Sequence, residues 1–168
     1  MKEKIQKFRD YLDYVERHYD NVQKAWKVLQ EQCGDMRFIY DDYLFNCIDS
    51  NVKNHDLSKL SQEEFTQYRQ FFYPAPDEEK SKDLMKTAWN NHLQKNPHHW
   101  QHWTSKSYGN PYESEVYFIE NIIDWMAMGY EFNDTAKDYY EKNKSEIALP
   151  KWSIELMYKI FDKVYPLT

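Results

Sequence analysis

Residues 4–31 read KIQKFRDYLDYVERHYDNVQKAWKVLQE and contain neither glycine nor proline. Apolar side chains recur in this stretch at spacings of three and four residues, which is the period of one face of an α-helix. They are Phe8, Leu12, Val15, Tyr19, Val22, Trp26 and Leu29. The pattern predicts one long amphipathic helix, with Gly34 as a stop signal after it.

The composition extends this helical prediction to the whole chain. Only three of the 168 residues are glycine, whereas β-sandwiches and nucleotide-binding α/β folds need more turn glycines. Hydrophobic residues make up 41% and charged residues 30%, which is typical of a globular chain. We therefore expect an all-α fold, a single compact domain over residues 1–168 with about six helices.

The same spacing predicts the later helices. They cover residues 38–55, 61–72, 77–95 and 112–130, and two closing helices start near Asp134 and Pro150. Ser61-Gln-Glu-Glu64 has the sequence of a capping box, in which the two side chains bond each other's backbone amides. Residues 98–111 are expected to form a loop or a short turn of helix.

The charge and the cysteines limit the function classes. A formal net charge of −6 argues against general binding to a nucleic-acid backbone, although a bound metal can still attract a nucleotide. Cys33 and Cys47 are too few for a disulfide framework or a zinc finger. No segment has the length of a membrane span or the pattern of a signal peptide, so we expect a cytoplasmic protein without membrane contact.

The strongest candidate for chemistry is the run His55-Asp56-Leu57-Ser58-Lys59. An imidazole and a carboxylate that follow each other at a helix end can face one cation. Lys59 lies one turn further, where its ammonium can meet a phosphate held by the metal. The alternative is that a serine caps the next helix and Lys59 is solvated.

A second group of histidines follows. His92 is expected near a helix end, and the break at Asn96-Pro97 allows His98 or His99 to approach it. Nitrogen and oxygen ligands of this kind suit Zn, Fe, Mn or Ni. The alternative is a polar, aromatic loop without a metal.

Asp124 stands inside the apolar run Ile122-Ile123-Asp124-Trp125-Met126. A buried carboxylate is costly unless it is paired or bound to a metal. Asp124 is therefore either a metal ligand or the partner of a tyrosine or tryptophan.

Taken in order, these residues resemble the motif of the HD-domain superfamily of metal-dependent phosphohydrolases. They are His18, His55-Asp56, His92, His98 or His99, and Asp124. The superfamily is all-helical, and its HD-x-G-K form is similar to His55-Asp56-Leu57-Ser58-Lys59, with Ser58 in place of the glycine.

More closely, the chain resembles an uncharacterised family of phages and Firmicutes, the domain of unknown function 5662. The similarity is carried by His18 with Asn21-Val22 and Ala25-Trp26, by residues 54–59, Glu63-Glu64-Phe65 and Phe72-Tyr73-Pro74, and by Ala88-Trp89, residues 96–100, residues 124–128 and residues 140–144.

The resemblance implies a ligand set and a reaction. The core metal ligands would be His18, His55, Asp56 and Asp124, while His92 and His98 or His99 would hold a second ion. Lys59, His92 and His98 would act on the substrate, a nucleotide or a related small phosphoester. One or two divalent ions (Mn, Fe, Zn, Co, Ni or Mg) would be the cofactor. The alternatives are a di-iron oxygenase and a non-catalytic interaction module that a metal stabilises.

Overall fold

The computed structural model describes residues 1–105 and 111–166, and its regular structure there consists of helices without strands. The described part holds nine α-helices and one short 3-10 helix, which confirms the all-α class with more helices than expected. Of the predicted loop over 98–111, residues 106–110 lie outside the described residues.

The chain divides into two compact units, and each is described by itself. The first comprises Met1–Tyr19 and Asp56–Asn96, and the second comprises Asp20–His55 and Pro97–Thr168. Helix α1 (Lys2–Gln32) is the predicted amphipathic helix and contributes residues to both units. One domain over residues 1–168 stays a prediction.

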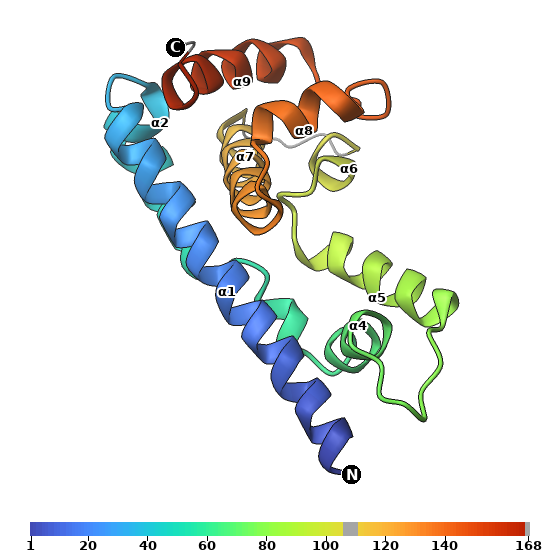
Figure 1. Cartoon of the computed structure of the whole chain (residues 1–168). Coiled ribbons are helices and arrows are strands. Elements are labelled where there is room, and N and C mark those ends of the chain that lie inside the picture. Colours follow the sequence, from blue (N-terminus) through green and yellow to red (C-terminus); the bar gives the residue numbers. More distant parts are fainter. Residues whose placement is uncertain (106–110, 167–168) are drawn as a thin grey trace. The chain divides into compact units, whose positions relative to one another are not determined.

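The first unit contains the start of α1 together with three further helices. These are η1 (Leu57–Leu60), α4 (Phe65–Phe72) and α5 (Lys82–Lys95). Helix α4 packs against α5 (Figure 1) and also against η1. The small core of the first unit is mainly aromatic, and Tyr11, Tyr68 and Ala88 are buried in it.

Helix α5 begins five residues later than the predicted start at 77, and Ser81 caps it by accepting a hydrogen bond from the Leu84 amide. The reason lies in Glu78. Its carboxylate accepts hydrogen bonds from the buried guanidinium of Arg69 and from the amide of Ala75, which holds the preceding segment as a loop.

The second unit is built around α7 (Pro111–Phe132). The other helices are α2 (Arg37–Tyr40), α3 (Asp42–Lys53), α6 (Trp100–Trp103), α8 (Ala136–Asn143) and α9 (Lys151–Val164). Helices α3, α6, α8 and α9 all pack against α7, whose residues 118–127 are buried throughout. Figure 1 shows α6 and α8 beside α7. The predicted helix over 38–55 is two helices, because the Asp41 carboxylate caps α3 at the amides of Tyr43 and Leu44.

None of the helices in the described ranges has the length and hydropathy needed to cross a bilayer.

Candidate metal centre

The His55-Asp56 pair follows the end of α3. The amide of His55 still bonds to the Val52 carbonyl, whereas Asp56 takes a left-handed conformation with φ 54° and ψ 22°. Aspartate tolerates this region better than most residues with a side chain. The turn starts η1 directly afterwards, and His55 belongs to the second unit while Asp56 belongs to the first.

In the first unit, two histidines face the carboxylate of Asp56. Nε2 of His18 lies 3.5 Å from Oδ2, and Nε2 of His92 lies 3.3 Å from Oδ1. All three side chains are buried. Helix α1 supplies His18 and the last turn of α5 supplies His92. We call His18, Asp56 and His92 the Asp56 cluster.

Lys59 joins this cluster from η1. Its ammonium lies 2.7 Å from Oδ2 of Asp56, the oxygen that also faces His18. Oδ2 of Asp56 is therefore already paired with the positive charge of Lys59. The alternative of a solvated Lys59 does not hold, since only 13% of its side chain is exposed.

Glu64 orients His92 and was not among the predicted site residues. Its fully buried carboxylate accepts hydrogen bonds from Nδ1 of His92 (2.8 Å), from Nδ2 of Asn91 (2.7 Å) and from Oγ of Ser58 (3.0 Å). A carboxylate that holds Nδ1 in this way leaves Nε2 as the ligand atom of the imidazole. The predicted capping box is wrong, because Glu64 makes no side-chain bond at the start of α4.

The pKa of His92 reflects these neighbours. Burial lowers the pKa, but the charge of Asp56 and the bonds to Asp56 and Glu64 outweigh it and raise the pKa of His92 to about 9. Without a metal, the imidazole is therefore protonated at neutral pH. A metal ion would have to displace that proton.

In the second unit, the corresponding carboxylate is Asp124 of α7. Nε2 of His55 lies 3.6 Å from its Oδ1, and Nε2 of His98 lies 4.0 Å from its Oδ2. His98, His99 and Asp124 each offer a ligand atom, and these atoms lie within 4.8 Å of one another. The imidazoles of His55 and His98 are also in contact, with ring centroids 4.3 Å apart. We call His55, His98, His99 and Asp124 the Asp124 cluster.

Glu120 orients this second cluster and was also not predicted. It lies one turn before Asp124 on α7, and its Oε1 is 3.0 Å from Nδ1 of His55 and 3.2 Å from Nδ1 of His98. Its Oε2 accepts a hydrogen bond from Nδ2 of Asn51 at 3.0 Å. Burial acts to raise the pKa of Glu120, but His98 and the bonds from both histidines hold it at about 2. The ionised carboxylate therefore accepts from Nδ1 of each ring.

The donor types in both clusters suit a divalent ion, and in the second unit the ligand atoms of His98, His99 and Asp124 lie close enough together to hold one. Each places imidazole Nε2 atoms beside a buried aspartate, and each fixes a histidine through a buried glutamate. Nitrogen and oxygen donors of this kind suit Zn, Mn, Fe, Co or Ni. His92 lies in the first unit with His18, whereas His98 and His99 lie in the second unit with His55.

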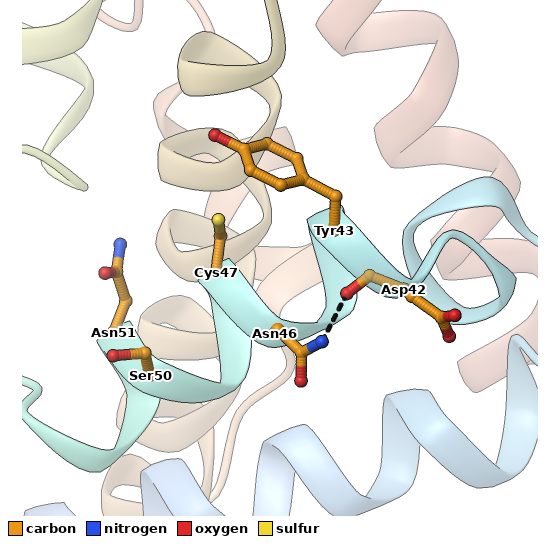
Figure 2. Close-up of a pocket in the computed structure, with 6 residues that line it drawn as sticks. All are labelled: Asp42, Tyr43, Asn46, Cys47, Ser50 and Asn51. Carbon is orange, nitrogen blue, oxygen red and sulfur yellow. Dashed lines mark hydrogen bonds between the residues drawn. The ribbon is translucent and has the colours of Figure 1, made fainter.

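A surface groove lies elsewhere in the second unit, along α3. Figure 2 shows its lining, from which Tyr43 and the free thiol of Cys47 project on the same side of the helix. None of the predicted site residues lines this groove. Asn51 lines the groove and also donates a hydrogen bond to Glu120, the residue that orients the Asp124 cluster.

The comparisons with known proteins give a family without an assigned activity. No curated protein and no solved structure matches the chain. The model of a family of unknown function, DUF5662, matches residues 7–162, which include every residue of both clusters. The chain therefore belongs to the DUF5662 family of unknown function.

Proposed function

We propose that the chain is a metal-dependent phosphohydrolase of the HD type that acts on a nucleotide or a related small phosphoester. The observation that supports this proposal is the repeated arrangement of glutamate, histidine and aspartate. In each unit a buried glutamate holds Nδ1 of a histidine whose Nε2 faces a buried aspartate. Outer carboxylates of this kind are typical of histidines that bind metals.

The chain would hold one or two divalent ions. His18, Asp56 and His92 are the ligands proposed for one ion, and His55, His98, His99 and Asp124 for the other. When bound, such an ion lowers the pKa of a coordinated water and polarises a phosphoryl oxygen. Glu64 and Glu120 are positioning residues, because they contact the ligands.

Three side chains have proposed roles toward the substrate. Lys59, which pairs with Asp56 in the structure, would neutralise charge on the phosphoryl group. If only one ion is bound, whichever of His92 and His98 does not bind it would protonate the leaving oxygen. The positive ion would also let a chain of net charge −6 bind an anionic substrate.

The test is phosphate release from a panel of nucleotides and simple phosphoesters with Mn²⁺, Co²⁺ or Mg²⁺ added. We expect release by the wild type, and loss of release in His55→Ala and in Asp56→Ala. His102→Ala is the matched control, because His102 lies on α6 outside both clusters. Equal release by wild type and by both cluster variants would exclude the proposal, as would no release by the wild type.

The same donor sets also suit iron, which makes a di-iron oxygenase the second candidate function. Analysis of the bound metal distinguishes it from a phosphohydrolase. Stoichiometric iron with a mixed-valence signal in electron paramagnetic resonance would favour a di-iron oxygenase. A chain that melts on metal removal and never shows a reaction would be a metal-stabilised interaction module.

A further inference from the structure

Two buried tyrosine hydroxyls in the first unit carry a further inference. Tyr11 is 1% exposed and Tyr68 is 5% exposed. Neither hydroxyl has a hydrogen-bond partner within residues 1–105 and 111–166. A buried hydroxyl without a partner is unfavourable, so such groups indicate a molecule that is not part of the chain.

Both tyrosines lie beside the Asp56 cluster. The ring of Tyr68, from α4, meets the ring of His92 edge-on with centroids 5.8 Å apart. The ring of Tyr11, from α1, lies 6.3 Å from that of Tyr14, and the Lys59 ammonium lies 5.6 Å from the Tyr14 ring. The two tyrosines thus come from different helices, α1 and α4, and α4 packs against η1, which carries Lys59.

The charges of the cluster act on both hydroxyls. Burial raises the pKa of Tyr11 and of Tyr68, Lys59 lowers both, and Asp56 and Glu64 raise both. The two phenols therefore keep their protons at neutral pH and remain hydrogen-bond donors.

A ligand beside two O–H donors and an ammonium must offer several acceptors and negative charge. An oxyanion has both, and a phosphoryl group has enough oxygens to meet three donors. We propose that Tyr11, Tyr68 and Lys59 bind one oxyanion next to the Asp56 cluster, the phosphoryl group of the substrate or product. That the oxyanion is a phosphoryl group rests on the proposed function.

The Asp56 and Glu64 carboxylates make this binding depend on a cation. Alone, they repel an anion, and Asp56 holds the Lys59 ammonium at 2.7 Å. A divalent ion on Asp56 would neutralise this charge and compete for the oxygen that Lys59 contacts. The ammonium would then be available to the anion, so phosphate should bind more tightly with metal than without it.

The experiment is calorimetric titration of inorganic phosphate into the full chain, with excess Mn²⁺ and without it. The variants are Tyr11→Phe, Tyr68→Phe and Lys59→Met. Each should weaken phosphate binding about tenfold or more, since a hydrogen bond to a charged group is lost. Tyr158→Phe is the matched control, because its hydroxyl donates to Glu141 in the second unit, and it should bind phosphate as wild type does.

Thermal unfolding separates binding from a structural role. Each phenylalanine variant removes a buried hydroxyl that has no partner within the described residues, so its Tm without phosphate should be unchanged or higher. The proposal is overturned if wild type binds no phosphate under either condition or if both phenylalanine variants bind it as wild type does. It is also overturned if they lose phosphate only together with a lowered Tm. Because no turnover is measured, phosphate binding that depends on Tyr11 and Tyr68 supports the inference even where no phosphoester is hydrolysed.

Discussion

Oε1 of Glu120 lies 3.0 Å from Nδ1 of His55, although 65 positions separate the two residues in the chain. The same oxygen lies 3.2 Å from Nδ1 of His98. One carboxylate therefore sets the orientation of two imidazoles and directs their Nε2 atoms toward Asp124. The ligand geometry of this unit depends on a residue that is not itself a proposed ligand.

Replacing Glu120 with Gln should weaken metal binding without unfolding the chain. The amide keeps the size of the side chain but loses the charge that favours Nδ1–H on both rings. Loss of such an outer partner reduces metal affinity about 10- to 100-fold. Calorimetric titration with Mn²⁺ measures the change in metal affinity.

Glu115→Gln is the matched control, because Glu115 lies on the same helix and pairs with Arg37. It should leave the Mn²⁺ affinity unchanged. If Glu120→Gln binds Mn²⁺ as tightly as Glu115→Gln does, then Glu120 has no positioning role.

Glu64 should contribute to the stability of the fold as well as to the orientation of His92. Its buried carboxylate joins η1 to two residues of α5 through bonds from Ser58, Asn91 and His92. Hydrogen bonds to a buried charge are strong, so Glu64→Gln should lower the free energy of unfolding by about 2–4 kcal/mol. Urea unfolding compares it with Glu63→Gln, the same change at an exposed neighbour. Equal midpoints for the two variants would contradict the role assigned to Glu64.

The sequence could predict the all-helical fold and single out the histidines as candidate ligands, but it did not single out Glu64 or Glu120. Periodicity is a local signal, and the stripe of α1 is visible without any tertiary contact. The partners of Glu64 lie 6, 27 and 28 positions away, so its local pattern favoured a cap instead. Glu120 did leave a signal: it precedes Asp124 by one turn within the buried run of α7, which places two carboxylates on one helix face.

The start of α5 shows the same limit. Asp77 has the properties of a helix start, yet the neighbouring Glu78 bonds to Arg69 and keeps the segment in a loop. A guanidinium on α4 is outside any local window. Tertiary pairing therefore overrode the local preference.

The Arg69–Glu78 pair should make stability depend on acidic pH. Arg69 holds the pKa of Glu78 well below its usual range, with further bonds from Lys4 and the Ala75 amide. A carboxyl whose pKa is lower in the folded state stabilises the fold above its unfolded pKa, about 4.3. That stabilisation is lost as the pH falls toward the folded pKa.

The measurement is Tm against pH from 7 to 2 for wild type and Glu78→Gln. Wild type should melt at a higher temperature near pH 7, and the difference should shrink below about pH 4. Glu79→Gln, at an exposed neighbour, should follow wild type at every pH. A difference that stays constant down to pH 2 would show that ionisation of Glu78 does not contribute.

Gly129 should not tolerate a side chain. A Cβ there would lie 2.6 Å from the carbonyl oxygen of Asp134, where the chain turns back after α7, and backbone cannot move aside cheaply. Gly129→Ala should lower the free energy of unfolding by about 1–3 kcal/mol. Gly34→Ala is the control, since its Cβ would meet nothing within 4 Å, and it should change stability by less than about 0.5 kcal/mol. Equal stability of the two variants would show that the backbone at Asp134 can shift to accommodate the added methyl group at little cost.

His98 and His102, which both follow the Asn96-Pro97 break, should differ in how much they contribute to metal binding. His98 is buried against Glu120 and faces Asp124, whereas His102 lies on α6 outside both clusters. A ligand that binds only the folded state stabilises it by about 2.7 kcal/mol at 100 times its Kd. Mn²⁺ should therefore raise the Tm of wild type and of His102→Ala, and EDTA should reverse the rise. In His98→Ala, the loss of one imidazole should reduce the rise at the same Mn²⁺ concentration. An equal rise in both variants would remove His98 from the proposed ligand set.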